Sequence, residues 1–372
     1  MTRPIGVGIL GANPDRGWAA RAHIPAIAAS PQFALTAVAT TREESAEAAR
    51  TRFGAQHAFT DARSLASHAD VDLVVVTVKV PAHVELVATA LEAGKHVYCE
   101  WPLSRTAAEA AVLATDARAV GVHAVVGLQA RFAPSVGRAR AMIDAGHLGT
   151  VQSATIYSSR SKGNTRDIPA WTAYTYDHRD RAGLVEVLGG HALDLVQYLL
   201  GPIRDLSART TIRRPEHRLV ETGEPIDVTA PDHFLASAEL DTGTVVTMHL
   251  HDGEAAQPRT RIEIAGTAGN LALISAPETN PWAAQLQIGQ LDLYESRPDQ
   301  PEWTPVHVRA DDASALPIEA ANVARLYHHL ATDLQQGSYL TPDFHVAHEL
   351  HKLIDQTPPP ENASKSVPRE LP

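Results

Sequence analysis

A glycine-containing turn at residues 8–18 is the first segment of this sequence with a clear chemical meaning. It reads Gly-Ile-Leu-Gly-Ala-Asn-Pro-Asp-Arg-Gly-Trp and joins a short apolar run to a stretch of helical composition. Glycines in such a turn let the backbone approach a pyrophosphate closely, and the amides at the following helix N-terminus favour negative charge. We therefore expect a dinucleotide site here. Its expected contacts are Gly11, Ala12, Asn13, Arg16, Gly17 and Trp18.

The glycine pattern of this turn departs from G-x-G-x-x-G. Counted from Gly11, Asn13 occupies the second glycine position, and one extra residue precedes Gly17. Asparagine tolerates left-handed backbone angles better than most residues, so the turn remains feasible. The alternative interpretation is a dinucleotide-type fold that has lost its nucleotide.

The end of the second predicted strand, residues 35–39, bears on the choice between NAD and NADP. A fold that binds NAD usually places an acidic residue there to bind the ribose hydroxyls. Here the strand is followed by Thr40, Thr41 and Arg42. The absent carboxylate and the nearby arginine favour NADP over NAD, with Thr40 and Arg42 as contacts. Alternatively, Arg42 is a solvated charge at the entry to the next helix.

Several side chains could move a proton. His191 and Asp194 are three residues apart in a predicted helix and share a face, so Asp194 could orient His191. An unperturbed imidazole pKa near ~6.5 suits this task, although packing or capping would also explain the histidine. Lys79 ends a buried strand at the edge where ligands bind in open α/β sheets. It could contact the nucleotide, act as a catalytic group, or simply be a solvated charge at the end of the strand. Tyr174 or Tyr176 are further candidates in an irregular stretch.

Three further clusters have simpler interpretations. Residues 160–166, Arg-Ser-Lys-Gly-Asn-Thr-Arg, are expected to form a mobile solvated loop, or alternatively to grip an anionic or polyhydroxylated ligand. His249 and His251 alternate on one strand and share a face, which favours a surface or subunit-interface pair over a metal site. His345 and His348 lie at adjacent helical positions, but zinc sites need three or four converging ligands, so we predict no metal.

The first 134 residues alternate predicted strands and helices. The run at 71–78 is nearly all β-branched and apolar, as expected for a strand buried on both faces. Strands that alternate with helices predict a doubly wound parallel sheet of the Rossmann type. The other expected strands lie at 6–10, 35–39, 96–99 and 123–127, and the helices at 18–29, 45–53, 83–93 and 107–119.

The pattern changes after a helix at 135–145. Strands in direct succession predict an open antiparallel sheet, flanked by helices. We expect strands at 151–158, 234–239, 245–251, 261–265 and 271–274, and helices at 191–200, 320–335 and 345–356. The fold class is thus α/β plus α+β. The predicted domains are a dinucleotide-binding domain at 1–134, a substrate and oligomerisation domain at 135–356, and a disordered tail at 357–372.

Composition narrows the function classes. A chain of 372 residues is long enough for two domains, and a net charge of −11 argues against a nucleic-acid partner. The longest apolar stretch is far too short to span a membrane, and we expect no signal peptide. The single cysteine, Cys99, lies in an apolar strand, which favours inert packing in a reducing compartment. We therefore expect a cytoplasmic protein.

Several segments resemble the glucose-fructose oxidoreductase / inositol dehydrogenase (Gfo/Idh/MocA) family. Residues 80–83, Val-Pro-Ala-His, are similar to its Asn-Pro-x-x-His segment under the nicotinamide, and residues 129–134 to the segment after the last Rossmann strand. Residues 190–194, Gly-His-Ala-Leu-Asp, match the region whose histidine faces the substrate, and residues 266–269 a late turn. The resemblance spans roughly residues 5–275. It implies further cofactor contacts from Val78, Lys79, Pro81, His83, Glu100, Trp101, Gln129 and Arg131.

The tripeptide Glu100-Trp101-Pro102 replaces the Glu-Lys-Pro of most enzymes of this family. The resemblance implies that the lysine holds and protonates the reacting oxygen, whereas tryptophan has no proton to exchange near neutral pH. Val187 also stands where many members have an aspartate. Trp101 could stack on a nicotinamide or sugar ring, or fill the core. Residues 17–23, 78–81, 100–101, 128–131 and 231–233 resemble the branch that contains a fungal repressor of the galactose regulon.

Two functions follow as expectations. The first is an NAD(P)-dependent oxidoreductase acting on a sugar or cyclic polyol, with His191 moving the proton and Lys79 or Tyr174 as replacements for the lysine. The second is a non-catalytic dinucleotide or sugar sensor that binds another protein. In this family the open sheets commonly pair between subunits, and a large apolar face needs cover, so we expect a homo-oligomer, most simply a dimer.

Overall fold

The computed structural model describes residues 3–276, 280 and 282–360, and these residues form two compact units. Unit 1 comprises residues Met1–Arg138, Gln287–Gln290 and His307–Lys352. Unit 2 comprises residues Ala139–Leu286, Leu291–Val306 and Leu353–Pro372. The chain passes from unit 1 to unit 2 after Arg138, and the sequence analysis expected a domain boundary after residue 134. The assignment of the late helices differs, because α8 and most of α9 group with unit 1.

Unit 1 is built on a six-stranded parallel sheet in the order β3-β2-β1-β4-β5-β6. The order reverses between β1 and β4, so the crevice at the carboxyl ends of these two strands is where a doubly wound sheet receives a ligand. All four residues of β4 are buried, as expected for a strand covered on both faces. The strands are β1 (Ile5–Leu10), β2 (Phe33–Ala39), β3 (His57–Phe59), β4 (Leu73–Val76), β5 (His96–Cys99) and β6 (Ala124–Val126).

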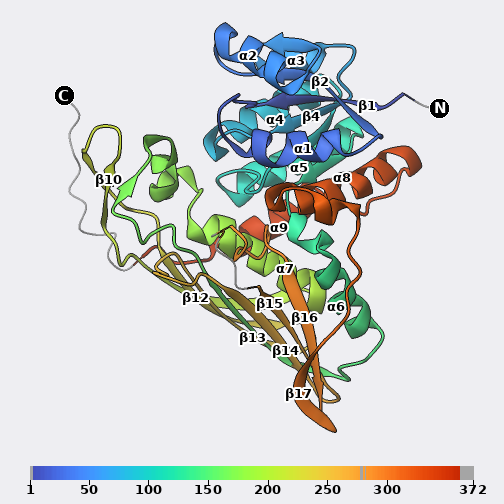
Figure 1. Cartoon of the computed structure of the whole chain (residues 1–372), viewed down its shortest axis with the longest axis vertical. Helices are drawn as coiled ribbons and strands as arrows, with labels where there is room; N and C mark the ends of the chain where they lie inside the picture. The colour runs from blue at the N-terminus through green and yellow to red at the C-terminus, as the bar shows by residue number, and fades with distance from the viewer. Residues whose placement is uncertain (1–2, 277–279, 281, 361–372) are drawn as a thin grey trace. The chain divides into compact units, whose positions relative to one another are not determined.

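Helices cover this sheet (Figure 1). The late helix α8 (Ile318–Gln336) packs on α1, and its residues Val323, Leu326, Tyr327 and Leu330 are fully buried in one cluster with β1 and β4. This burial explains why a segment so late in the chain joins unit 1. The other helices are α1 (Ile24–Ala28), α2 (Glu43–Phe53), α3 (Ala62–Ser67), α4 (His83–Glu92), α5 (Ala107–Val120), α6 (Pro134–Asp144) and α9 (Phe344–Asp355).

Unit 2 contains an eight-stranded sheet in the order β17-β16-β15-β14-β7-β13-β12-β9. The expected antiparallel arrangement holds for every neighbouring pair except one, because β7 and β13 are parallel. The long connection between these two strands includes α7 (Gly190–Leu200) and allows this crossover. The strands are β7 (Val151–Ser159), β9 (Ile203–Thr211), β12 (His233–Leu240), β13 (Val245–His251), β14 (Thr260–Gly266), β15 (Asn270–Ser275), β16 (Leu291–Arg297) and β17 (Gln300–Pro305).

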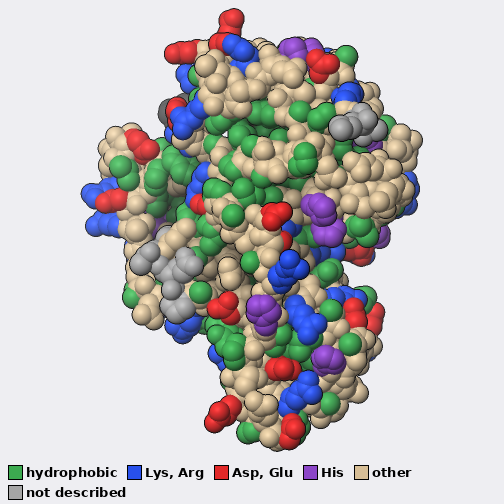
Figure 2. Space-filling view, turned by 45° about the vertical axis from the view of Figure 1, so that its right-hand side comes forward, with side chains coloured by type: hydrophobic (Ala, Val, Ile, Leu, Met, Phe, Trp, Pro, Cys, Tyr) green, Lys and Arg blue, Asp and Glu red, His purple; other side chains and the backbone are tan. Residues whose placement is uncertain are grey.

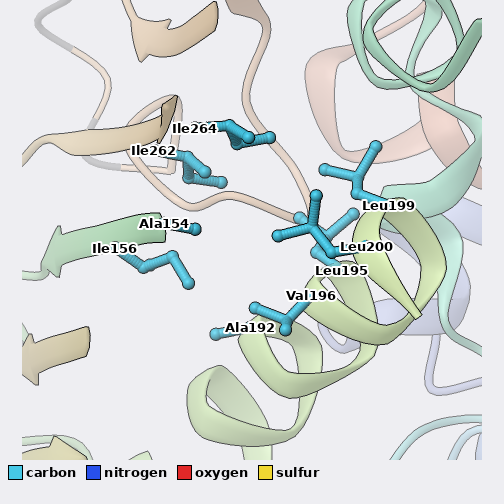
Figure 3. Close-up of a pocket in the computed structure, with 9 residues that line it drawn as sticks. All are labelled: Ala154, Ile156, Ala192, Leu195, Val196, Leu199, Leu200, Ile262 and Ile264. Atoms are coloured by element: carbon cyan, nitrogen blue, oxygen red, sulfur yellow. The ribbon is translucent and has the colours of Figure 1, made fainter. Parts of the chain in front are cut away.

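Helix α7 covers the inner face of this sheet (Figure 3). Small and branched apolar side chains from α7, β7 and β14 enclose a cavity of about 10 Å³. Its lining is apolar throughout, so we interpret it as a packing gap rather than a ligand site. A small second sheet lies beside the irregular segment that follows β7. Its strands are β8 (Asp167–Ile168), β10 (Glu216–Leu219) and β11 (Pro225–Asp227).

Acidic and basic side chains are interspersed over the face of the molecule shown in Figure 2. No helix among the described residues is long and apolar enough to cross a membrane. Pro358 belongs to the tail that was expected to be disordered. Its carbonyl accepts a hydrogen bond from the hydroxyl of Thr210 at 3.0 Å. Residues 361–372 lie outside the described part of the chain, so the expectation of disorder there stays a prediction.

Candidate functional site

The glycine turn at 11–17 has the backbone that a dinucleotide turn requires. Gly11 has φ +95° and Gly17 has φ +103°. A Cβ on Gly11 would lie 2.8 Å from Cγ1 of Val78, whereas one on Gly17 would meet no described atom within 4 Å. Gly11 therefore lets the turn pass close to the end of β4. Gly17 leaves open space just before the short helical segment Ala19–His23.

Asn13 supports this turn differently from the sequence-based expectation. Its backbone is not left-handed, because Arg181 is the only non-glycine residue with positive φ in the described chain. Instead, the side-chain oxygen of Asn13 accepts hydrogen bonds from the backbone N–H groups of Asp15 at 2.9 Å and Arg16 at 3.2 Å. The asparagine therefore closes the extended loop with its side chain, as an Asx turn does.

Several buried side-chain polar atoms of unit 1 have no hydrogen-bond partner among the described residues. Nε1 of Trp18, a donor, and Oε1 of Gln129, an acceptor, are the two of these atoms that come from predicted cofactor contacts. Leaving a buried polar atom unpaired costs about 1–3 kcal/mol, so a ligand that pairs with such atoms would be favoured. With the open turn, these atoms fit a nicotinamide dinucleotide, which supplies the hydride acceptor or donor when it is bound.

The end of β2 provides hydroxyl groups and one cation. The hydroxyl of Thr40 lies 2.6 Å from that of Ser45 and donates to the carbonyl of Arg42 at 3.0 Å. Arg42 is exposed at the start of α2 and forms no ion pair with another described residue. The structure thus places both predicted ribose contacts at this strand end. Its arginine is available to a 2′-phosphate.

His83 fixes the loops that follow β4 and β5. The side chain is 1% exposed, with Nδ1 2.8 Å from the carbonyl oxygen of Pro102 and Nε2 3.0 Å from that of Val78. Burial lowers the pKa of His83 and so favours a neutral ring. The sulfur of Cys99 lies 3.3 Å from Nδ1 and is buried, which agrees with its predicted packing role. His83 therefore acts on the site by positioning both loops.

Glu100 belongs to a buried hydrogen-bond chain in unit 1. One oxygen of its carboxylate lies 2.8 Å from Nε2 of His23, whose Nδ1 lies 2.9 Å from the hydroxyl of Tyr327. The carboxylate also fills the space beside Gly127, where a Cβ would lie 2.8 Å from Oε1. The sequence pattern did not predict that these residues meet, because Glu100 follows β5, His23 ends the helical segment Ala19–His23 and Tyr327 lies in α8.

Trp101, the residue at the lysine position, is 5% exposed. Its ring lies 4.7 Å from that of His351 on α9, at an interplanar angle of 35°. This packing supports the core-filling interpretation of Trp101. His351 therefore packs against the Trp101 ring.

His191 lies in unit 2, at the second position of α7. It is 3% exposed, and its Nδ1 has no hydrogen-bond partner among the described residues. Asp194 therefore does not bind this nitrogen, although it is also buried. Burial and the positive charge of Arg160 lower the pKa of His191 to about 3, in contrast to the unperturbed value expected from the sequence. His191 is thus a neutral hydrogen-bonding group near pH 7 and a weak base.

The depressed pKa of His191 predicts acid sensitivity of unit 2. Between pH 6.5 and about 3, the unfolded histidine binds a proton and the native one does not, so stability falls as the pH falls. This residue alone should contribute about 1.4 kcal/mol per pH unit within that window. In urea unfolding at pH 7, 5 and 4, the free energy of unfolding should fall less steeply with decreasing pH for His191→Gln than for the wild-type protein. The exposed His345→Gln is the control, and equal slopes for all three proteins would contradict the assignment.

The basic stretch after β7 is more ordered than the expected solvated loop. The guanidinium of Arg160 donates to both oxygens of Asp252, at 2.6 and 3.0 Å, and both side chains are more than 90% buried. The Nζ of Lys162 lies 4.7 Å from the ring centroid of Tyr176. Burial and Arg160 lower the pKa of Lys162 to about 8. The sequence analysis named this stretch but did not single out Lys162, because only the fold brings Tyr176 and Asp252 to it.

The groups around Lys162 border a second small cavity in unit 2. Tyr176, Arg214, His217 and Asp252 contribute to its wall. The ring of Tyr176 lies 4.4 Å from that of His217, and burial raises the pKa of Tyr176 above its ordinary value. The mixed polar lining distinguishes this cavity from the apolar gap under α7. A hydroxylated ligand could exchange hydrogen bonds with it.

The other predicted site residues lie as follows. Lys79 is exposed at the turn before α4, and Pro81 is also exposed there. Arg131 is half-buried in the short helix after β6. Burial raises the pKa of Tyr174, so its hydroxyl keeps its proton more firmly than a free tyrosine does. Tyr174 is therefore a weaker candidate for proton transfer than the sequence suggested.

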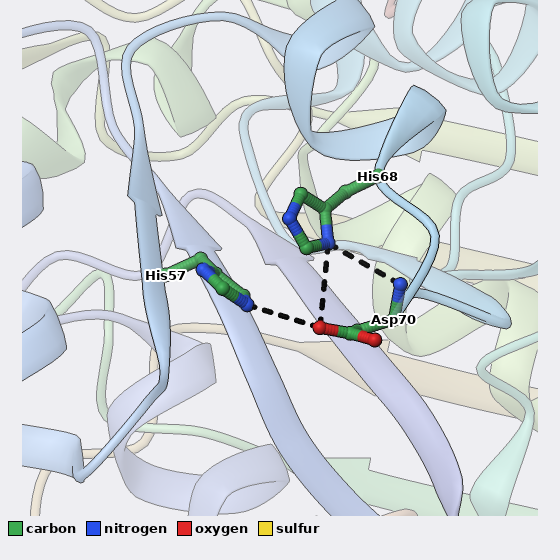
Figure 4. Close-up of side chains that lie close together, drawn as sticks. All are labelled: His57, His68 and Asp70. Atoms are coloured by element: carbon green, nitrogen blue, oxygen red, sulfur yellow. Dashed lines mark hydrogen bonds and ion pairs between the residues drawn. The ribbon is translucent and has the colours of Figure 1, made fainter.

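Two groups of metal-ligand side chains converge among the described residues. His57, His68 and Asp70 form one group on unit 1 (Figure 4). Nε2 of His57 lies 3.2 Å from Oδ2 of Asp70, and Nδ1 of His68 accepts the Asp70 N–H at 3.2 Å. These hydrogen bonds account for the arrangement. The second group, His345, His348 and Glu349, lies at the surface of α9 and carries no metal assignment.

The parallel sheet, its switch point and the open glycine turn define the class of protein as a dinucleotide-binding oxidoreductase fold. A model of the oxidoreductase family with an NAD-binding Rossmann fold matches residues 5–128, and a model of the Gal80p C-terminal domain matches residues 134–275. The dehydrogenase aclE of Aspergillus oryzae is 32% identical over 268 residues, which cover 68% of this chain and 72% of aclE. The chain belongs to the Gfo/Idh/MocA family.

Both branches suggested by the sequence occur among its relatives. The galactose/lactose metabolism regulatory protein GAL80 of Saccharomyces cerevisiae is 30% identical over 290 residues, 73% of this chain and 66% of GAL80. A super-repressor mutant of Gal80p from that species has a TM-score of 0.84 at 26% identity over 95% of both chains. Levoglucosan dehydrogenase in complex with NADH and L-sorbose has a TM-score of 0.80 at 20% identity, over 94% of this chain and 95% of the enzyme. That last likeness is evidence of a shared fold only.

Proposed function

We propose that this protein is an NAD(P)-dependent oxidoreductase that transfers a hydride to or from a sugar or cyclic polyol. The observation that carries this proposal is the buried, unpartnered Nδ1 of His191. A buried nitrogen without a partner costs about 1–3 kcal/mol, and a ligand hydroxyl would remove this cost. A molecule with several hydroxyl groups also suits the polar wall near Tyr176 and Asp252.

The residues of unit 1 would hold the dinucleotide. The open turn from Gly11 to Gly17 would receive the pyrophosphate. Thr40 and Arg42 would contact the ribose, and the exposed Arg42 favours a 2′-phosphate. We therefore propose a preference for NADP over NAD. Arg42→Ala should weaken NADP binding about tenfold and leave NAD binding unchanged.

Gly11→Ala should abolish or strongly weaken dinucleotide binding. The alanine would need a φ of +95° and would place its Cβ 2.8 Å from Val78, which together cost about 1–3 kcal/mol. Fluorescence titration with NAD(H) and NADP(H) should show at least a tenfold loss of affinity. Gly137→Ala is the control, because its backbone is not left-handed and no described atom lies within 4 Å of the new Cβ.

Turnover tests the proposal directly. The purified protein is incubated with NAD(P)⁺ or NAD(P)H and a panel of sugars and cyclic polyols, and nicotinamide absorbance is followed. Reduction or oxidation of the cofactor with one class of substrate is expected. Binding of neither dinucleotide would reject both the enzyme and the sensor described next.

A non-catalytic sensor is the second candidate. Two observations favour it: Trp101 lacks the proton of the lysine it replaces, and the chain is 30% identical to the regulatory protein GAL80. Such a protein would bind a dinucleotide or sugar and a protein partner without turnover. Dinucleotide binding with no turnover across the panel would support this alternative.

We further propose a homo-oligomer. Leu235 and Val245 are 42% and 54% exposed on the outer face of the large sheet, which a second subunit would cover. Sedimentation velocity tests this, and a monomer at micromolar concentration would contradict it. A cytoplasmic location is supported by the single cysteine, which forms no disulfide within the chain.

A further inference from the structure

Two imidazoles and one carboxylate converge at the surface of unit 1 (Figure 4). Nε2 of His57 lies 3.2 Å from Oδ2 of Asp70, and Nδ1 of His68 lies 3.8 Å from the same oxygen. All three atoms lie within 4.8 Å of one another. Hydrogen bonds hold this group together without an ion, but two imidazoles and a carboxylate are also a ligand set that binds transition metals in proteins.

The spacing of these three atoms is close to what a tetrahedral metal ion requires. Zinc binds histidine nitrogen and carboxylate oxygen at about 2.0–2.2 Å, so two ligand atoms of one tetrahedral ion are roughly 3.3–3.6 Å apart. The distance from His57 to Asp70 is already near this range, and that from His68 to Asp70 is slightly longer. The two histidine side chains are 34% and 29% exposed, so small rotations can close the remaining gap.

The ring of His68 has the tautomer that a metal ligand needs. Its Nδ1 accepts the backbone N–H of Asp70 at 3.2 Å, so this nitrogen carries a lone pair and the neutral ring has its proton on Nε2. On His57, a metal would replace the proton shared between Nε2 and the Asp70 carboxylate. Histidine binds a metal through a deprotonated nitrogen, and both rings can offer one toward Asp70.

The backbone that carries the three side chains is fixed by contacts within unit 1. His57 lies in β3 and pairs with β2. The ammonium group of Lys95 donates to the carbonyl of His68 at 3.2 Å. The carbonyl of Asp70 packs on Gly6, where a Cβ would lie only 1.9 Å from its oxygen. The ligands are therefore preorganised, and binding would order few additional groups.

The second convergent group, on α9, is less suited to a metal. His345, His348 and Glu349 all come from one helix. The carboxylate of Glu349 already accepts a hydrogen bond from the ammonium group of Lys352 at 2.9 Å. In contrast, Asp70 forms no ion pair with a lysine or arginine of the described chain. Its negative charge is therefore available to a cation.

We propose that His57, His68 and Asp70 bind one divalent transition-metal ion, with zinc as the best fit and water completing the coordination. Two nitrogen ligands select against calcium and magnesium, which prefer oxygen. His57 begins β3 and Asp70 precedes β4, so this site lies at the amino ends of the parallel strands. The glycine turn follows the carboxyl end of β1. The ion thus stabilises unit 1 by tying β3 to the loop before β4, and it takes no part in hydride transfer.

Calorimetric titration of the full chain, first dialysed against EDTA, tests this site. Zn²⁺ should bind with micromolar affinity. His57→Ala, His68→Ala and Asp70→Asn should each weaken this binding at least about tenfold, since even the loss of an outer hydrogen-bond partner of a metal ligand costs that much. All three side chains are partly exposed, so the variants should fold, which circular dichroism checks. His345→Gln is the control and should keep the wild-type affinity.

Thermal unfolding provides a second readout. Zn²⁺ at a hundredfold excess over its Kd should raise the Tm of unit 1 by roughly 5 °C, whereas Mg²⁺ at the same concentration should not. The shift should disappear in the three variants. Absence of zinc binding, or wild-type affinity in any of the folded variants, overturns the proposal. The dinucleotide titration and the turnover assay decide the proposed function separately.

Discussion

Asp252→Ala should lower the free energy of unfolding of unit 2 by about 3–5 kcal/mol. The substitution leaves the guanidinium of Arg160 buried, with its side chain 9% exposed, and removes the carboxylate that accepts both of its hydrogen bonds. The cost comes from the unpaired buried charge rather than from the strength of the pair itself. Urea unfolding followed by circular dichroism measures it.

The chain contains a matched control for this prediction. Arg218 and Asp167 form the same two-bond arrangement, at 2.7 and 3.1 Å, but their side chains are 45% and 47% exposed. Asp167→Ala should leave the unfolding midpoint nearly unchanged, because water solvates the remaining arginine. The double variant Arg160→Leu/Asp252→Leu should be more stable than Asp252→Ala. Equal effects of Asp252→Ala and Asp167→Ala would contradict the buried-charge argument.

Trp101→Lys should destabilise unit 1 by at least about 3–5 kcal/mol and should not increase turnover. The indole is 5% exposed and packs on the ring of His351. A lysine would lose most of that buried apolar surface and place an ammonium group beside an imidazole. Although the substitution recreates the Glu-Lys-Pro tripeptide, the surroundings are those of a packed aromatic residue.

Two further variants serve as controls for this prediction. Trp101→Phe keeps an aromatic ring and should lose less stability than Trp101→Lys. Trp303→Lys changes a tryptophan that is 37% exposed on β17 and should have a small effect. If Trp101→Lys retained wild-type stability and increased turnover, Trp101 would be a site residue with a free ring, and its assignment to the core would be wrong.

Local patterns determined much of unit 1. The apolar run that became β4, the glycines at 11 and 17 and the alternation of strands with helices predicted the parallel sheet and its ligand-binding edge. The sequence also located β13 and α7 closely, because their periodicities of 2 and 3.6 are carried by neighbouring residues. Short elements such as β3 and α3 were missed, since three to six residues carry too little periodicity.

By itself, the sequence determined the Rossmann half, the family and the loss of the lysine at position 101. Only the tertiary structure decided that α8 joins the core of unit 1, that β7 and β13 pair in parallel, and that Arg160 meets Asp252. These features depend on contacts between residues far apart in the chain, which periodicity does not encode. The same long-range packing sets the burial that makes His191 a weak base.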